Sequence, residues 1–265
     1  MRFNIDKKSK MQFVTLKDDE YFTKLKHSGM VVAKCLQTFK ERVDSKTPNL
    51  NLKDIEAECV EIIEKHECIP TFKGYKGFPG FVCLSVNKEL VHGIPRDYIL
   101  KEGDVVTLDL GAHTECGVIA DAAVSAIYGE PLIPKHVELL KVCEEALYKA
   151  ISIIKVGNRL GCIGNAIHRH TRDKGFSLVT KYAGHGIDRG VLHSQPIVLN
   201  KSRCDDGIHI QSGLTIAIEP MLILGTGNSK TNIKKDKWTV CGKNISAHYE
   251  HTIFVKEGGV EIMTM

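Results

Sequence analysis

Two aspartates of this chain lie inside apolar segments, where a carboxylate is costly to bury. Asp109 belongs to the β-branched run Val105–Leu110, and Asp121 belongs to the run Val118–Ile127. Glycines and polar residues separate the two runs, which is typical of a turn, so a hairpin could place the two carboxylates side by side. No Lys or Arg occurs in residues 102–134. We therefore expect the two carboxylates either to face water or to hold a cation between them.

Three further side chains of ligand type occur later in the chain. Glu219 lies alone among the aliphatic residues of Gly213–Gly225, and Glu250 heads a strand-like run in Ser246–Lys256. His185 stands between two glycines, which allow the backbone to approach a neighbour closely. Any one of the carboxylates alone is better explained as a surface residue of a half-exposed strand. Together, two Asp, two Glu and one His offer oxygen and nitrogen ligands that suit a pair of divalent cations with bridging carboxylates.

Four helices and many strands must position these residues. Apolar residues recur at helical spacing in Asp18–Val43, Leu52–His66, Lys135–Ile154 and Cys162–Lys174. Strand and turn patterns fill residues 69–127 and the remainder of the chain. Two rounds of paired helices followed by strands predict an α+β fold, in which two related halves share one curved antiparallel sheet. The two aspartates fall in the first half and the other three candidates in the second, so we expect the site at the seam.

The composition is that of an ordinary globular protein and argues against several classes. The formal charge is +4 and 43% of the residues are hydrophobic, so sequence-specific nucleic-acid binding is not indicated, and we expect Lys230–Lys237 to be a solvated loop. Nine cysteines without a CxxC spacing predict reduced thiols and a cytoplasmic location. The first residues lack the apolar core of a signal peptide, and no apolar run approaches the roughly 18 residues of a membrane span, so no membrane partner is expected.

Longer motifs carry a resemblance to a known family. In chain order they are Gly-Tyr-Lys-Gly-Phe-Pro at 74–79, Cys-Leu-Ser-Val-Asn-Lys-Glu-Leu-Val-His-Gly-Ile-Pro at 83–95, Gly-Asp-Val-Val-Thr-Leu-Asp at 103–109, Gly-His-Gly-Ile-Asp-Arg-Gly at 184–190, Ile-Glu-Pro at 218–220 and Ser-Ala-His-Tyr-Glu-His-Thr at 246–252. In these motifs the chain resembles the type I methionine aminopeptidases, which are M24-like metallopeptidases of the pita-bread fold. The resemblance covers about residues 15–265 and implies a single catalytic domain over 1–265 with a short N-terminal extension at 1–14. The His-Gly-Ile-Pro segment favours this branch over the proline-directed peptidases, and the short chain without a long helical insert favours type I over type II.

The resemblance implies a role for each matching position. Five residues match the metal ligands: Asp109, Asp121, His185, Glu219 and Glu250. Three match catalytic residues: His92, His193 and Glu219. Seven match the substrate-binding residues around the methionine: His92, Tyr75, Phe78, Cys83, Leu192, His193 and Trp238. The backbone at Asn87 and Ser246 falls where the family can hold one monovalent cation. Judged from sequence alone, lone histidines are more often structural and the aromatic residues are more often part of a core.

The activity that the resemblance implies is removal of the initiator methionine from nascent proteins and peptides with a small second residue. Two divalent ions, bridged by Asp109 and Glu250, would hold a water between them and lower its pKa to give a hydroxide nucleophile. His193 would stabilise the oxyanion and Glu219 would carry the proton. The ligands do not distinguish Mn, Fe, Co and Zn. The implied partners are nascent N-termini at the ribosome, and we expect a monomer. Two alternatives stay open: a proline-directed aminopeptidase of the same fold, and a pita-bread binding protein that has lost catalysis.

The chain departs from the family pattern at three places. One extra residue between Asp109 and Asp121 predicts a bulge within Leu110–Ala120. One extra residue between His185 and His193 leaves open whether Val191 or Leu192 lines the pocket. Asp188 replaces a common glycine, for which the sequence offers no reason. Among the remaining candidates, His248 and His251 flank Glu250 and could orient a ligand, whereas His113 and Glu115 are expected to be exposed turn residues.

Overall fold

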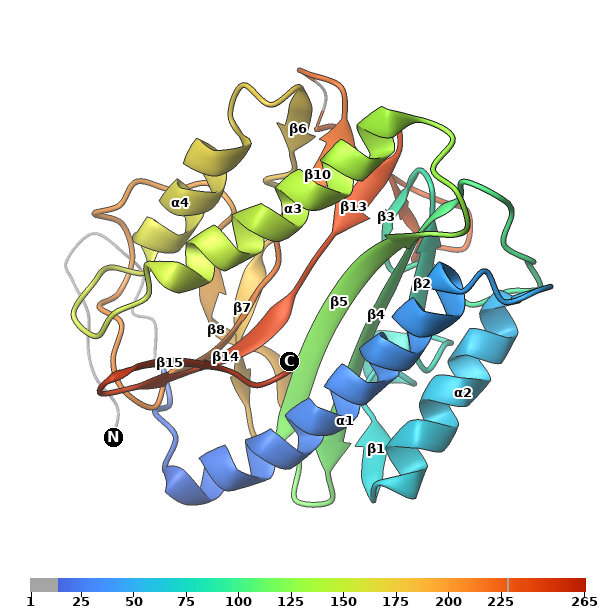
Figure 1. The fold of residues 1–265 in the computed structure, drawn as a ribbon. Coiled ribbons are helices and arrows are strands. Elements are labelled where there is room, and N and C mark those ends of the chain that lie inside the picture. Colours follow the sequence, from blue (N-terminus) through green and yellow to red (C-terminus); the bar gives the residue numbers. More distant parts are fainter. Residues whose placement is uncertain (1–13, 228) are drawn as a thin grey trace.

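The computed structural model describes residues 14–227 and 229–265. Residues 1–13 of the predicted N-terminal extension lie outside this part of the chain. Two pairs of helices cover the outer faces of a layer of strands (Figure 1). The helices are α1 (Asp19–Asp44), α2 (Leu52–Lys65), α3 (Pro134–Ser152) and α4 (Gly161–Thr171), with a short 3-10 turn, η1, at Tyr75–Gly77.

The strands of the first half are β1 (Cys68–Pro70), β2 (Cys83–Val86), β3 (Glu89–Val91), β4 (Val105–Thr114) and β5 (Ile119–Ile127). The strands of the second half are β6 (Phe176–Leu178), β7 (Gly184–Asp188), β8 (Val191–Val198), β9 (Thr215–Ile218), β10 (Met221–Leu224), β11 (Asn232–Ile233), β12 (Val240–Cys241), β13 (Ser246–His248), β14 (His251–Lys256) and β15 (Gly259–Ile262). All the pairings between these strands are antiparallel.

The predicted α+β class is confirmed. The strands form separate hydrogen-bonded sheets, however, and not the one continuous sheet that the sequence predicted. β5, β4, β1 and β2 form a four-stranded sheet in the first half, whereas β15-β14-β9-β7-β8 form a five-stranded sheet in the second. Two three-stranded sheets, β13-β10-β6 and β11-β12-β3, complete the layer. The two large sheets meet where Ala123 of β5 pairs with Glu250 beside β14. This backbone bridge is the seam of the two halves.

Each helix pair buries an apolar face against its own half. The side chain of Asp18 accepts a hydrogen bond from the Tyr21 amide and caps α1, and Asn51 caps α2 in the same way. Leu25, Val32 and Phe39 of α1 recur at helical spacing and are fully or nearly fully buried. The apolar face of α1 packs on β4 and β5, and α3 packs on β10 and β13. The helices therefore hold β5 and β13 from outside, on opposite sides of the seam.

The predicted helix bounds hold except at one end. The helix expected over Cys162–Lys174 stops at Thr171, because Asp173 and Gly175 adopt the left-handed backbone of a turn at φ 63° and 84°. None of the helices in the described residues is long and apolar enough to cross a membrane.

The expectation that all thiols are reduced is wrong for one pair. Cys162 and Cys204 form a disulfide, although 42 residues separate them in sequence. α4 begins against the loop that carries Cys204, so closely that a Cβ on Gly161 would lie 2.2 Å from the Arg203 carbonyl oxygen. Tertiary packing of α4 thus brings together two cysteines whose spacing gave no sign of pairing.

Candidate metal centre

The β4–β5 hairpin places the two aspartates on one face. Its register is continuous, with Asp109 opposite Ala123 and Gly111 opposite Asp121. Since side chains alternate along a strand, Asp109 and Asp121 are diagonal neighbours on the same side of the hairpin. The predicted bulge within Leu110–Ala120 is absent. Residues 115–118 form the turn instead, and the ladder remains regular.

His113 was expected in that turn, and the structure places it elsewhere. It pairs with Ile119 near the end of β4, is half-buried, and makes a 3.0 Å hydrogen bond to Thr71. Glu115 lies in the turn and is exposed, as predicted. The prediction for His113 was wrong because β4 continues past the apolar run Val105–Leu110. It passes through Gly111, which packs against Phe72, and ends only after His113.

The other three candidates come from the second half. His185 is the second residue of β7, between glycines that have no room for a side chain: a Cβ would lie 2.3 Å from the Ala217 oxygen at Gly184 and 2.0 Å from the Gln195 oxygen at Gly186. Glu219 follows β9, and its carbonyl accepts a hydrogen bond from Asn200. Glu250 lies between β13 and β14, at the seam.

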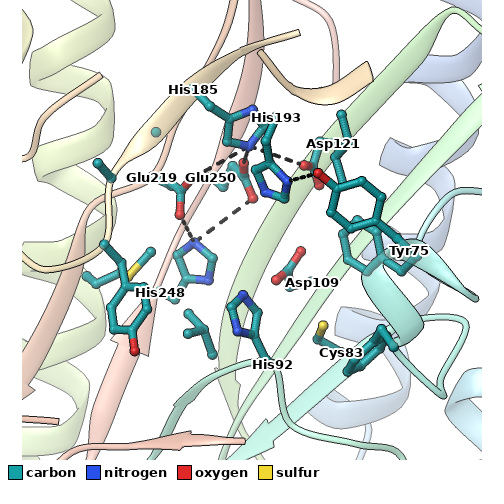
Figure 2. A pocket seen from close by; sticks show the side chains of 18 of the residues that line it. Tyr75, Cys83, His92, Asp109, Asp121, His185, His193, Glu219, His248 and Glu250 are labelled. Carbon is teal, nitrogen blue, oxygen red and sulfur yellow. Dashed lines mark hydrogen bonds and ion pairs between the residues drawn. The ribbon is translucent and has the colours of Figure 1, made fainter. Parts of the chain in front are cut away.

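All five side chains meet at the base of one cavity (Figure 2). The His185 Nε2 atom lies 3.6 Å from Asp121 Oδ2, 3.7 Å from Glu219 Oε1 and 4.0 Å from Glu250 Oε1. Asp121, His185 and Glu250 each offer one ligand atom within 4.8 Å of the others. Asp109 faces them from β4 (Figure 2). These separations exceed a hydrogen bond but suit atoms that share one ion at about 2.0–2.2 Å.

The electrostatics of this cluster favour a cation. Burial raises the pKa of Asp109 to about 7, and burial with the neighbouring carboxylates raises the pKa values of Asp121, Glu219 and Glu250. Asp121 Oδ1 is buried and has no hydrogen-bond partner among the residues that the structure describes. Four carboxylates with raised pKa values and an unsatisfied oxygen are unfavourable unless positive charge joins them. The residues present therefore fit a site for divalent metal.

His185 has the protonation that a ligand needs. Its Nδ1 atom lies 3.1 Å from the Gly186 carbonyl, to which it can donate, so Nε2 keeps its lone pair toward the carboxylates. Burial lowers the pKa of this imidazole to about 4. The ring is thus neutral at physiological pH.

His193 lies beside the cluster, and Tyr75 supports it. The His193 ring centroid is 4.3 Å from that of His185, and its Nδ1 atom makes a 2.7 Å hydrogen bond with the Tyr75 hydroxyl. The Nε2 atom is thereby left to face the cavity. His92 approaches from the loop after β3, on the side opposite His193 (Figure 2). The sequence gave no indication of the bond between Tyr75 and His193, which joins positions 118 residues apart.

An apolar pocket opens beside the cluster, within a cavity of about 700 Å³. Its walls include the five predicted pocket residues Tyr75, Phe78, Cys83, Leu192 and Trp238. Phe78 and Trp238 meet edge to face with centroids 5.4 Å apart. Of the two open candidates, Leu192 lines the cavity and is 2% exposed, whereas Val191 is 46% exposed. Phe72 also lines the pocket; sequence reasoning missed it, although an aromatic residue two positions before the Gly-Tyr-Lys-Gly motif could have suggested it.

The cavity is also lined by residues that the sequence did not assign, Val91, Tyr182 and Met221. His248, which was expected to orient a ligand, lines it as well. The Nε2 atom of His248 lies 3.7 Å from Glu219 Oε2 and 4.0 Å from Glu250 Oε2, and neither ring nitrogen has a hydrogen-bond partner among the described residues. Its spacing of two residues from Glu250 in an extended segment is the signal that pointed to this face.

Three remaining sequence observations have structural outcomes. His251 does not orient Glu250: its ring contacts Tyr148 and its Nδ1 atom bonds Thr264 at 2.9 Å, outside the cavity. Asp188, which the sequence left unexplained, forms an ion pair with Lys17. At the predicted monovalent position, the Asn87 carbonyl accepts a 2.9 Å hydrogen bond from the Ser246 amide.

Comparison with known proteins agrees with this arrangement. The profile of metallopeptidase family M24 matches residues 23–257. A methionine aminopeptidase of Mycoplasma capricolum is 40% identical over 253 residues, which cover 95% of this chain and 98% of that protein. The crystal structure of a methionine aminopeptidase from Thermotoga maritima is 37% identical, with a TM-score of 0.89 over 95% of this chain and 99% of the other. A prolidase from Pyrococcus furiosus, 18% identical, shares the fold with a TM-score of 0.73, and the match covers 94% of this chain and 65% of the prolidase.

The chain therefore belongs to metallopeptidase family M24, and within that family to the methionine aminopeptidases.

Proposed function

We propose that this protein is a metal-dependent aminopeptidase that removes the initiator methionine from nascent proteins and peptides with a small second residue. The observation that carries the proposal is the shared cavity: the five ligand-type side chains and the apolar pocket open into the same space. A chain terminus held in that space would present its first peptide bond to the cluster while its first side chain enters the pocket.

The five clustered residues would hold two divalent cations. Asp121, Glu219 and Glu250 each have a carboxylate oxygen within 4.0 Å of the His185 Nε2 atom, and Asp109 faces them from β4, so these five side chains would supply the ligands. Mn, Fe, Co and Zn all accept these ligands. The backbone at Asn87 and Ser246 is the candidate position for one monovalent cation. Bound divalent ions supply Lewis-acid activation of a water and of the scissile carbonyl.

The chain's own residues supply proton transfer and positioning. Glu219 accepts the proton of the attacking water and delivers it to the leaving nitrogen. His193, neutral and held by Tyr75, donates from Nε2 to the developing oxyanion. His92 lies across the cavity from His193 (Figure 2) and would contact the N-terminal part of the substrate.

The pocket favours an unbranched side chain. Cys83 is buried, and burial raises the pKa of its thiol, so it lines the pocket as a neutral group. The flat rings of Tyr75, Phe78 and Trp238 leave a slot suited to methionine or norleucine, while the second methyl of leucine would meet a wall. A misfit of one methylene changes selectivity by about 10–200-fold.

We further propose that the protein acts as a cytoplasmic monomer on nascent chains at the ribosome. Sedimentation equilibrium tests the monomer, and co-sedimentation with translating ribosomes, with and without emerging N-termini, tests the partner. A dimer mass, or absence from the ribosomal pellet, would contradict these two points without affecting the chemistry.

A peptide series tests the activity. The metal-loaded protein should release free methionine from Met-Ala-Ser, cleave the norleucine analogue, act far more slowly on Leu-Ala-Ser, and reject Met-Lys-Ser. Hydrolysis of an Xaa-Pro dipeptide in preference to Met-Ala-Ser would favour a proline-directed aminopeptidase. Metal binding without hydrolysis of either substrate would favour a binding protein of the same fold.

A further inference from the structure

The two halves meet in a short antiparallel ladder. Backbone groups pair at its centre, and side-chain hydroxyls take part at both ends. On β5, the backbone groups of Asp121, Ala123 and Ser125 point away from β4 and toward the second half, where the Ser125 carbonyl accepts a 2.8 Å hydrogen bond from the Tyr249 hydroxyl. At the centre of the ladder, Ala123 and Glu250 exchange two backbone hydrogen bonds of 3.3 and 2.9 Å. Continued regularly, this ladder would pair Asp121 with Thr252 and Ser125 with His248. Figure 1 shows β5 running beside β13 and β14 over this stretch.

A side-chain hydroxyl replaces one backbone partner at each end of this ladder. Thr252 Oγ1 accepts from the Asp121 amide at 2.9 Å and donates to the Asp121 carbonyl at 2.7 Å. Ser125 Oγ accepts from the His248 amide at 3.0 Å and donates to the His248 carbonyl at 2.9 Å. A hydroxyl has one hydrogen to give, so Thr107 must donate its own to Ser125 across their 2.7 Å contact. Both hydroxyl residues are buried, at 0% and 2% exposure.

The two ends differ in what they fix. The Thr252 hydroxyl comes from β14 and holds Asp121, one of the three residues whose ligand atoms lie closest together. The Ser125 hydroxyl comes from β5 and holds His248, which lines the cavity beside Glu219 and Glu250 but is not one of the five candidate ligands. Each hydroxyl therefore spans the same seam with two hydrogen bonds, and only one of them fixes a candidate ligand.

We propose that Thr252 is a positioning residue of the metal centre: its hydroxyl fixes the backbone of Asp121 against the second half before any metal binds. This inference rests on the proposed function. The physical reason lies in the metal-free cluster, where four carboxylates from both halves face each other. Asp121 comes from the first half, whereas His185, Glu219 and Glu250 come from the second. Asp121 can share a metal with them only if its strand is held at a fixed distance from the second half.

The matched pair Thr252→Val and Ser125→Ala separates positioning from general support of the seam. Both variants remove a buried hydroxyl that bridges the two halves, and both should lower the unfolding temperature. Isothermal titration of the metal-free proteins with Co²⁺ should show about 10–100-fold weaker binding for Thr252→Val. This is the usual loss when a residue that orients a metal ligand by hydrogen bonding is removed. Ser125→Ala should bind Co²⁺ close to the wild-type affinity, and Thr252→Ser should restore it.

A further variant controls for loss of a buried threonine hydroxyl. Thr215 of β9 is buried in the same five-stranded sheet, and its Oγ1 has no partner among the described residues. Thr215→Val should leave Co²⁺ affinity unchanged. Unchanged affinity in Thr252→Val, or an equal loss in Ser125→Ala, would overturn the proposal. Wild-type protein that binds no Co²⁺ at all would instead contradict the proposed function.

Hydrogen exchange of the wild-type protein covers the case in which Thr252→Val does not fold. If the Thr252 hydroxyl fixes Asp121 in advance, the Asp121 amide should exchange as slowly in the metal-free protein as the Ala123 amide, which has a backbone partner. Protection that arises only after Co²⁺ is added would show that the metal orders Asp121, and the proposal would be wrong.

Discussion

The hairpins β4–β5 and β7–β8 each bring two candidate ligand or catalytic side chains to the same cavity, and they do so by opposite means. β4 and β5 pair without interruption from Val105–Ile127 to His113–Ile119, so strand alternation alone sets Asp109 and Asp121 on one face. β7 and β8 change register twice. A regular ladder after the pair His185–Ile197 would put Pro196 opposite Gly186, but Ser194 is found there. The displaced backbone carries His193 toward His185.

This difference in regularity corresponds to a difference in role. Metal ligands must keep fixed separations whether or not the metal is bound, and an uninterrupted ladder packed against α1 provides that rigidity. His193 must present one ring nitrogen to a substrate, and a bulged strand can redirect a side chain in this way. Because the strand is bulged at this point, its own ladder does not fix the His193 ring. The hydrogen bond from the Tyr75 hydroxyl fixes it instead. The regular hairpin thus carries only candidate ligands, whereas the irregular hairpin carries the candidate ligand His185 and the candidate catalytic residue His193.

The largest expected effect comes from the regular hairpin. Asp109→Asn should lower kcat/KM by at least about 10³-fold, equivalent to about 4 kcal/mol, because a neutral amide replaces a charged ligand. Metal content, measured by mass spectrometry after desalting, should fall with activity, and Glu219→Ala should behave alike. Full metal loading with normal turnover in either variant would remove that residue from the ligand set.

The irregular hairpin should show the complementary behaviour. His193→Ala should reduce kcat by about 10²-fold with metal content intact, because the imidazole acts on the developing oxyanion. Steady-state kinetics on Met-Ala-Ser together with metal analysis checks both points. A rise in KM alone would make His193 a binding residue. Loss of metal from His193→Ala would show that His193, like Asp109, contributes to metal binding.

The carboxylates should make the metal-free protein sensitive to pH. The pKa of Asp109 is raised to about 7, above its unfolded value of about 4. Between these values the folded state binds more protons, so the stability from this group is fully present below pH 4 and is lost as pH rises through 7. The metal-free Tm should therefore fall by about 5–10 °C between pH 5 and pH 8. Calorimetry should show a smaller fall in Asp109→Asn and in the metal-loaded protein; equal slopes in all three would contradict the assignment.

The smallest effect concerns the support of the bulged strand. Tyr75→Phe keeps the ring and removes only the hydroxyl that fixes His193, so kcat should fall by about 3–10-fold, the worth of one hydrogen bond. Phe78→Leu is the contrasting change, because it alters the pocket wall without touching His193 and should act mainly through KM for methionine peptides. A purely KM effect in Tyr75→Phe would show that its hydroxyl orients substrate instead.

Much of the molecule was predictable because its signals are local. Helical periodicity gave α1 and α2 to within a residue, since an apolar helix face depends on neighbours along the chain. Asp109 and Glu219 were conspicuous because a lone carboxylate in an aliphatic run is costly without a partner. His185 was identifiable from its flanking glycines, which the close approach of Ala217 and Gln195 requires.

Other features depended on the tertiary structure because they join segments distant in sequence. The extra residue after Asp109 was absorbed by the turn, since the packing of β4 and β5 against α1 favours an unbroken ladder over a bulge. Leu192 faces the cavity because the register of β8 shifts at Gly186. The bond from Tyr75 to His193, the hydroxyls across the seam and the position of His248 beside Glu219 and Glu250 arise where the two halves meet. The sequence indicates which side chains could bind metal or catalyse a reaction. The distances between those side chains are fixed only when the two halves pack together at the seam.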